Sequence, residues 1–312
     1  MKQIISILLA ALILAGGLCS CQLKKDDEKT TETTVTTTAA AVEEETISET
    51  VTETTTAAVQ TTAAPATVPQ TQQEVVTEAP EITGVKTITD GNKTVVYPLA
   101  LESTQRTYPV ISWANGTGCP TQLYTKLLEA IANGGYIVVA DSSVMSGDGT
   151  AQIDSVNYIL NKNSDSSSVF YNKVDTYAIG VCGQSQGGRS CINAAQKDSR
   201  IRCVVSIAGA STADEARGLS VPCFFITGTS DNIVDSSKWC KPSYDAVTGR
   251  AAYASIVGGT HLSFSTHTAT MAEYTVSWFD AYLKGDDNAK QVFYNGGKLS
   301  TDGAWTDFQN KN

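Results

Sequence analysis

The feature that most constrains the fold is a regular alternation of short apolar runs with segments of helical periodicity between residues 94 and 283. The apolar runs predict strands at 94–97, 109–113, 136–140, 176–182, 203–207, 222–227 and 252–257. The periodic segments predict helices at 121–133, 151–160, 186–195 and 268–283. This alternation is typical of βαβ crossovers, so we expect an α/β domain with a mostly parallel sheet and helices on both faces. Functional side chains then belong at the carboxyl ends of the strands.

The first 82 residues have a different composition. Residues 1–20 begin with a short positive segment and continue with a 15-residue apolar run, which is short for a bilayer span and typical of a secretory signal. Residues 22–82 contain no Phe, Tyr or Trp, and 18 threonines fall between residues 30 and 82. Such a segment has too little apolar surface to offset its ordering entropy. We therefore expect a disordered linker over residues 21–82 and a folded domain over residues 83–312.

The apolar run ends in Leu18-Cys19-Ser20-Cys21. A leucine three residues before a cysteine and a small residue directly before it resemble the lipobox of bacterial lipoproteins, and this pattern fits Cys21 better than Cys19. The pattern predicts export and a lipid on Cys21 that holds the chain at a membrane surface without spanning it. An ordinary cleaved signal peptide is the alternative.

Charge is divided unevenly between these two parts. Residues 22–82 carry 12 acidic and three basic residues, whereas residues 83–312 carry 20 acidic and 18 basic ones. The formal net charge of −10 therefore belongs mostly to the linker. No basic patch dense enough to neutralise phosphates stands out in the sequence, which argues against a nucleic-acid partner.

Six cysteines lie in the expected domain: Cys119, Cys182, Cys191, Cys203, Cys223 and Cys240. In an exported protein some of them are expected to pair, but the sequence does not choose among the possible connectivities. Three of them, Cys182, Cys203 and Cys223, fall in apolar strand-like runs, where a small buried hydrophobic residue is the better interpretation. No pair has CxxC spacing and the chain has only two histidines, so we expect no zinc site.

A candidate nucleophile stands between a predicted strand and a predicted helix, in Gly183-Gln184-Ser185-Gln186-Gly187. At that position the GxSxG pattern is typical of a nucleophile elbow. A serine in so sharp a turn leaves no room for side chains two residues away, so both glycines are needed. We expect Ser185 to be the nucleophile and the N–H of Gln186, at a helix N-terminus, to donate to an oxyanion. A plain glycine-rich turn is the alternative.

A serine nucleophile needs a base and an acid that orients it. His261 follows the last predicted strand on a loop and is favoured as the base, whereas His267 suits a surface or capping position. Asp231 is the first acidic residue after the strand at 222–227 and is the preferred acid, with Asp235 second. Asp231 could instead only form a turn. The chain order serine, aspartate, histidine is that of an α/β-hydrolase.

The second oxyanion donor should come from the loop after the strand at 109–113, which reads Ala114-Asn115-Gly116-Thr117-Gly118. Its two glycines permit close backbone approach, and the N–H of Thr117 is the candidate donor.

Four segments resemble the bacterial cutinases and poly(ethylene terephthalate) hydrolases, within the wider dienelactone hydrolase and chlorophyllase-like group. They read YNKVDT at 171–176, GVCGQSQGG at 180–188, GTSDNI at 228–233 and GGTH at 258–261. The resemblance covers residues 92–285 and implies an α/β-hydrolase fold and a serine hydrolase of carboxylic esters without a cofactor.

Departures from the family pattern bear on the substrate. The family's polyesterases hold an aromatic ring between an aromatic residue at the Thr117 position and a tryptophan after the strand that here runs into 208–211, and this chain has no aromatic residue at either place. Gly228 stands where those enzymes often have a disulfide cysteine. Stacking on a flat aromatic substrate should therefore be weak, unless Trp113 or Trp239 supplies a ring. An aliphatic, acetyl or carbohydrate-linked ester is at least as good a candidate.

Together these features predict a serine esterase tethered at the cell surface. Ser185 attacks the ester carbonyl, and His261, oriented by Asp231, takes and returns the proton. The N–H groups of Gln186 and Thr117 hold the oxyanion. The alternatives are a non-catalytic hydrolase-fold binding protein displayed on the linker, and a polyesterase or lipase acting on polymeric or lipid esters. The sequence predicts membrane contact through the lipid anchor only and indicates no oligomeric state.

Overall fold

The structure, a computed structural model, describes residues 83–311. The predicted signal peptide (1–20), the lipidation site Cys21 and the predicted linker (21–82) lie outside the described residues. Residues 83–311 contain no helix long and apolar enough to cross a membrane.

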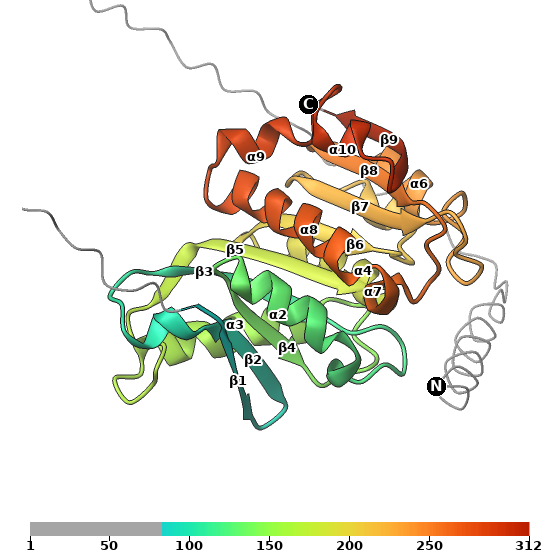
Figure 1. Cartoon of the computed structure of the whole chain (residues 1–312). Coiled ribbons are helices and arrows are strands. Elements are labelled where there is room, and N and C mark those ends of the chain that lie inside the picture. The colour runs from blue at the N-terminus through green and yellow to red at the C-terminus, as the bar shows by residue number, and fades with distance from the viewer. Residues whose placement is uncertain (1–82, 312) are drawn as a thin grey trace, which may run out of the picture. The chain divides into compact units, whose positions relative to one another are not determined.

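A single nine-stranded sheet with the order β1-β2-β4-β3-β5-β6-β7-β8-β9 organises the domain (Figure 1). The strands are β1 (Val85–Asp90), β2 (Lys93–Pro98), β3 (Tyr108–Ala114), β4 (Ile137–Asp141), β5 (Val174–Gln184), β6 (Ile201–Ile207), β7 (Cys223–Gly228), β8 (Ala251–Ile256) and β9 (Trp305–Lys311). From β4 to β8 all neighbours are parallel, whereas β1, β2 and β9 pair antiparallel at the two edges. The predicted α/β class and mostly parallel sheet are confirmed.

Helices cover both faces of this sheet (Figure 1). They are α2 (Thr125–Asn133), α3 (Thr150–Ser164), α4 (Gln186–Lys197), α5 (Ala213–Ala216), α6 (Cys240–Ala246), α7 (Ser263–Thr266), α8 (Thr268–Leu283), α9 (Asp287–Gln291) and α10 (Lys298–Thr301). Residues of α2 and α8 pack in one hydrophobic cluster, and residues of α3, α4 and α6 pack in a second. Because successive strand residues point to opposite faces, Val110 joins one cluster and Ile111 the other.

The predicted helix at 121–133 begins with a 3₁₀ turn, Thr121–Tyr124, before α2. Tyr124, the last residue of this turn, is buried and directs its hydroxyl toward the loop that follows β3. The helix prediction was therefore right in extent, but its first turn has a tighter geometry that places Tyr124 inside the molecule.

The sequence did not predict β9, which pairs with the far edge of β8. Only Trp305 of this strand is fully buried, and the rest of it is half-buried or exposed. An edge strand of this kind has no continuous apolar run, so sequence patterning alone does not reveal it.

All six cysteines in residues 83–311 are free and buried. The expectation that some of them pair is wrong for this structure, and the interpretation of Cys182, Cys203 and Cys223 as buried strand residues is confirmed. Burial raises the pKa of the Cys191 thiol to about 12, and burial together with the charge of Asp231 does the same for Cys240. These thiols are therefore protonated and unreactive at neutral pH.

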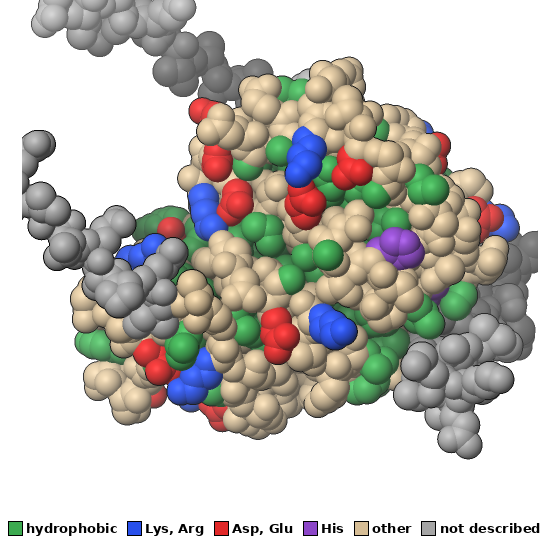
Figure 2. Space-filling model, viewed as in Figure 1, with side chains coloured by type: hydrophobic (Ala, Val, Ile, Leu, Met, Phe, Trp, Pro, Cys, Tyr) green, Lys and Arg blue, Asp and Glu red, His purple; other side chains and the backbone are tan. Residues whose placement is uncertain are grey.

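Acidic and basic side chains are interspersed over the face of the molecule seen in Figure 2. This distribution agrees with the near balance of charges that the sequence gives residues 83–312.

Candidate active site

Ser185 joins β5 to α4 in a strained backbone conformation. Its φ of 59° and ψ of −120° lie in a region that residues with a side chain rarely adopt. A Cβ atom at Gly183 would lie 2.4 Å from the carbonyl oxygen of Gly187, and a Cβ at Gly187 would lie 2.1 Å from that of Ala114. Both positions therefore require glycine, as the elbow pattern predicts.

Gln186 is the first residue of α4, so its N–H has no acceptor within the helix. The partial positive charge of the helix N-terminus adds to this N–H, and an anion is favoured there. The position of the Gln186 N–H therefore suits the role of oxyanion donor that the sequence predicts for it.

Asp231 and His261 form a buried pair at the carboxyl ends of β7 and β8. Their side chains are 0% and 4% exposed, and the distance from His261 Nδ1 to Asp231 Oδ2 is 2.9 Å. The other carboxylate oxygen of Asp231 accepts hydrogen bonds from the N–H groups of Ile233 and Val234, at 2.9 Å each. These donors fix the carboxylate, so its remaining oxygen holds the imidazole in one orientation.

The two loops that carry this pair touch each other. A Cβ at Gly228 would lie 2.3 Å from the carbonyl oxygen of Gly259, and Ser230 N–H donates to that same oxygen at 2.8 Å. With the loops in this arrangement, position 228 requires glycine, since a side chain there would push the acid loop away from the histidine loop.

The two less favoured candidates lie elsewhere. His267 is half-buried at the N-terminus of α8, where its Nδ1 lies 2.9 Å from Thr266 Oγ1. Asp235 accepts hydrogen bonds from Ser237 and forms an ion pair with Lys238. Neither contacts the Asp231–His261 pair, so the preference for Asp231 over Asp235 and for His261 over His267 agrees with the geometry.

A residue that sequence reasoning missed, Gln184, contacts the candidate base. The side-chain Nε2 of Gln184 is 3.2 Å from His261 Nε2 and 3.0 Å from the His261 carbonyl oxygen. Within residues 83–311 the Ser185 hydroxyl makes no hydrogen bond to His261, although catalytic hydrogen bonds are often long before substrate binds. A polar residue that directly follows the apolar run of β5 and directly precedes the candidate nucleophile is the signal that could have identified Gln184.

The loop that follows β3 lies against the first turn of α4, as the close approach of Gly187 to Ala114 requires. In this loop the N–H of Gly116 donates to the hydroxyl of Tyr124 at 3.0 Å, and the N–H of Gly118 donates to the carbonyl of Val144 at 3.2 Å. The N–H of Thr117, the candidate oxyanion donor, stands between these two anchored groups, and Thr117 itself is buried.

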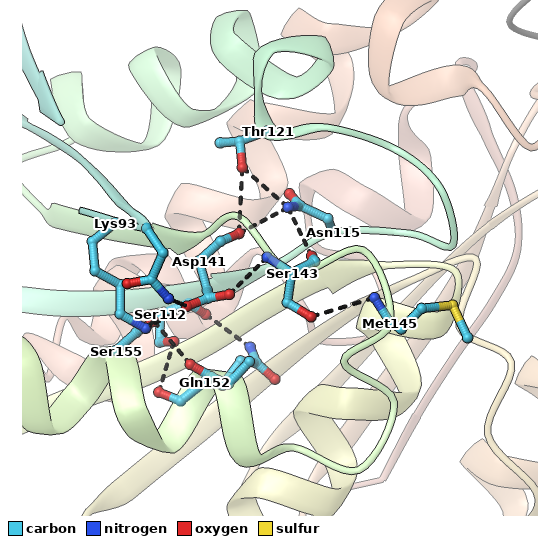
Figure 3. A network of polar contacts seen from close by, with 11 residues as sticks. Lys93, Ser112, Asn115, Thr121, Asp141, Ser143, Met145, Gln152 and Ser155 are labelled. Carbon is cyan, nitrogen blue, oxygen red and sulfur yellow. Dashed lines mark hydrogen bonds and ion pairs between the residues drawn. The ribbon is translucent and has the colours of Figure 1, made fainter. Parts of the chain in front are cut away.

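Asn115 anchors the start of the same loop (Figure 3). Its side-chain amide lies 2.9 Å from the carbonyl oxygen of Asp141 and 3.1 Å from that of Ser143, and its Oδ1 accepts from Trp113 Nε1 at 3.0 Å. The indole of Trp113 is fully buried, so this ring belongs to the core and is not available to a substrate. Trp239, by contrast, is 36% exposed.

A buried ion pair between Lys93 and Asp141 lies beside Asn115 at the start of this loop (Figure 3). Lys93 Nζ lies 2.5 Å from Asp141 Oδ2, and Asn92 Nδ2 lies 2.6 Å from the same oxygen. The second oxygen of Asp141 accepts from the N–H of Ser143 at 2.7 Å, and Lys93 also donates to Ser155 Oγ at 3.1 Å. Because each charged group has several partners, we expect this pair to hold the ends of the loops rigidly.

No group of three or more His, Cys, Asp or Glu side chains within the described residues is arranged to hold a metal ion.

Comparison with known proteins agrees with this fold. A family model described as PET hydrolase-like matches residues 51–310, which is most of the chain. The match confirms the resemblance inferred from the sequence, and the observed sheet is that of an α/β-hydrolase.

Several characterised proteins are similar to the chain. Cutinase est2 of Thermobifida alba is 25% identical over 209 residues, which cover 64% of this chain and 67% of that protein. A cutinase of Thermobifida fusca is 23% identical over 212 residues, with coverages of 64% and 67%. A bis(hydroxyethyl) terephthalate hydrolase of Streptomyces coelicolor is 23% identical over 121 residues, 38% of this chain and 39% of that protein. On the strength of the family match, the chain belongs to the PET hydrolase-like family.

Proposed function

We propose that the protein is a serine hydrolase that cleaves carboxylic esters through an acyl-enzyme on Ser185. The observation that carries this proposal is the strained Ser185 at the β5–α4 turn together with the buried Asp231–His261 pair at the same edge of the sheet. A strained backbone at a serine between a strand and a helix costs free energy, and strain of this kind is found mostly at functional sites. The cutinases and the terephthalate ester hydrolase among its relatives are ester hydrolases, which supports the same chemistry here.

In the first half-reaction the Ser185 oxygen attacks the ester carbonyl carbon, and its proton passes to His261 Nε2. The tetrahedral intermediate collapses by breaking the bond to the alcohol oxygen, which takes the proton from His261 and leaves. In the second half-reaction water attacks the acyl group and gives its proton to His261, which returns it to Ser185 as the acid is released. Asp231 stays ionised and stabilises the imidazolium through Nδ1.

The negative charge that develops on the carbonyl oxygen needs donors fixed in advance. The N–H of Gln186, at the start of α4, and the N–H of Thr117, held between two anchored residues, are proposed for this role. Removal of one such donor typically slows catalysis by roughly a hundred- to a thousandfold.

For the substrate we propose an ester without a flat aromatic acid, because position 117 and residues 208–211 offer no aromatic ring. Trp113 is buried, so it does not replace the missing clamp. The names of the relatives point to polyesters, and a polyester of aliphatic units satisfies both observations.

We also propose that the protein is exported and held at the cell surface by a lipid on Cys21, with residues 21–82 acting as a spacer. The support is the lipobox-like Leu18-Cys19-Ser20-Cys21 and the composition of the linker. We expect a Cys21→Ser variant to be lost from the membrane fraction of cells. The matched control, Cys19→Ser, should stay in that fraction.

Turnover of p-nitrophenyl acetate and butyrate tests the chemistry and separates it from a non-catalytic binding protein. We expect turnover by the full chain and loss of it, with retained folding, in Ser185→Ala. A Ser190→Ala variant, which alters a buried serine within α4, is the control. Equal turnover by Ser185→Ala and the parent would contradict the proposal.

A further inference from the structure

Gln184 lies at the centre of a chain of hydrogen bonds that joins the loop after β3 to the candidate base. The N–H of Gly116 donates to the Tyr124 hydroxyl at 3.0 Å, and that hydroxyl is 2.9 Å from Gln184 Oε1. At the other end of the amide, Gln184 Nε2 lies 3.0 Å from the His261 carbonyl oxygen and 3.2 Å from His261 Nε2. All of these side chains are buried.

The partners fix the direction of every bond in this chain. A backbone carbonyl only accepts hydrogen bonds, so the amide atom that faces the His261 carbonyl must be the NH₂ group. Oε1 of Gln184 must then face Tyr124, whose hydroxyl accepts from Gly116 N–H and donates its own proton to Gln184. The orientation of the amide therefore follows from its neighbours and is not arbitrary.

The same reasoning assigns the tautomer of the His261 imidazole. Since Gln184 presents an N–H to His261 Nε2, that nitrogen accepts and carries no proton. The proton of the neutral ring is then on Nδ1, where it is donated to Asp231 Oδ2 at 2.9 Å. This is the tautomer in which Nε2 can take a proton from a serine.

We propose that Gln184 is a positioning residue that keeps His261 Nε2 unprotonated and oriented, and that couples this nitrogen to the oxyanion loop through Tyr124. The inference rests on the proposed function. It gives a role to the second residue of the GxSxG string, on which the pattern itself places no requirement. The fit around the amide is tight, since a Cβ at Gly116 would lie 2.5 Å from Gln184 Oε1.

His261 Nε2 accepts through one in-plane lone pair, so Gln184 must release this contact before Ser185 can give its proton to Nε2. The imidazolium that results has an N–H at this position and offers Gln184 no acceptor there. Gln184 supplies and takes no proton in this step. It loses only the contact with Nε2 and retains its bonds to Tyr124 and to the His261 carbonyl. Because the contact exists only with the unprotonated ring, it favours the form of His261 that acts as a base.

Within residues 83–311, Asp231 is the charged side chain that contacts His261. The small cavity beside the imidazole is lined from α7 and α8 by uncharged side chains, Ser263, Phe264 and Met271. Tyr124 contacts the other end of the Gln184 amide, and burial holds the pKa of its hydroxyl well above the ordinary value. Burial also raises the pKa of the neighbouring Cys119 thiol. Tyr124 and Cys119 are therefore neutral over the pH range in which a histidine titrates, and they contribute no charge to it.

The test is the dependence of kcat/KM on pH in Gln184→Met and Tyr124→Phe. Methionine keeps the length of the side chain and removes its donors, so we expect the acidic limb of the profile to move to higher pH by about 0.5–1 unit. That shift is the threefold to tenfold change in proton binding expected for one hydrogen bond to the unprotonated form. Tyr124→Phe should move the limb less, in the same direction, and should add little in the double variant because both act through one amide.

Two variants serve as matched controls. Gln152 is a fully buried glutamine whose amide bonds to the carbonyl oxygens of Ser112 and Cys182, and Tyr136 is a buried tyrosine bonded to Asp280. Gln152→Met and Tyr136→Phe should lower stability and leave the position of the acidic limb unchanged. If Gln184→Met lowers kcat/KM equally at every pH, as a merely structural residue would, the proposal is overturned.

A second measurement separates this inference from the proposed function. The chain has only two histidines, so ¹⁵N-histidine labelling gives two imidazoles, and His267→Asn identifies the one that belongs to His261. An NMR titration then follows the ring without any substrate. A shift of its midpoint in Gln184→Met supports the contact even if no ester is turned over, and an unchanged midpoint overturns it even in an active enzyme.

Discussion

Replacing Lys93 by methionine should destabilise the domain by about 3–5 kcal/mol, because it leaves the Asp141 carboxylate buried without its cation. The two side chains are 7% and 10% exposed, and Nζ lies 2.5 Å from Oδ2. The carboxylate keeps its hydrogen bonds from Asn92 and from the Ser143 N–H in the variant, so we expect the lower half of this range. Urea unfolding followed by tryptophan fluorescence measures the change in the free energy of unfolding.

Two comparisons make this measurement specific to a buried charge. Lys86→Met breaks an ion pair with Glu102 whose side chains are 48% and 36% exposed, and it should cost less than about 1 kcal/mol. Adding Asp141→Asn to Lys93→Met removes the unpaired charge and should recover part of the lost stability.

The same variant connects stability to catalysis. Asp141 holds Ser143 and, through its carbonyl, Asn115 at the start of the loop that carries Thr117. Under folding conditions Lys93→Met should therefore lower ester turnover, by less than the roughly hundredfold cost of removing an oxyanion donor. If Lys93→Met unfolds at the same urea concentration as Lys86→Met, the argument from buried charge is wrong.

Three further predictions concern the site and the domain boundary. His261→Ala should lose nearly as much turnover as Ser185→Ala, while His267→Ala should stay within about tenfold of the parent; the reverse ranking in p-nitrophenyl ester assays would contradict the assigned base. A chain shortened to begin at Thr83 should fold and turn over small esters at the parent rate, and its failure to fold would refute the boundary. Thr117→Tyr should raise hydrolysis of an aromatic polyester film relative to an aliphatic one, since each aromatic contact contributes about 0.5–1.5 kcal/mol. A parent that degrades both films equally fast would refute the missing clamp.

Residues set by local patterns were predictable from the sequence. The strand-to-helix position of Ser185 and its flanking glycines follow from steric requirements within five residues. Asp231 and His261 each follow an apolar strand, and parallel strands bring their carboxyl ends to one edge of the sheet. The order of the strands therefore predicts that these two side chains lie near each other, and the structure has them hydrogen-bonded.

Residues whose roles depend on distant partners were not predictable. The side chain of Gln184 forms hydrogen bonds with Tyr124 and His261, which are 60 and 77 residues away in the chain. Lys93 meets Asp141 across 48 residues, and nothing near Lys93 in the sequence distinguishes it from a solvated strand residue. The expected disulfides were inferred from export, which suggests an oxidising environment. The structure instead has each of these cysteines as a free, buried residue, and the sequence contains no signal that distinguishes a buried thiol from a paired one.

Labelling of the full chain with a fluorophosphonate, followed by mass spectrometry of the peptides, tests the central claim most directly. The reagent forms a covalent bond with a serine only where a base and oxyanion donors activate that serine. We predict one modified residue, Ser185, with labelling lost in His261→Ala and retained in His267→Ala. Modification of a different serine, or no modification in a folded chain that hydrolyses esters, would contradict the account.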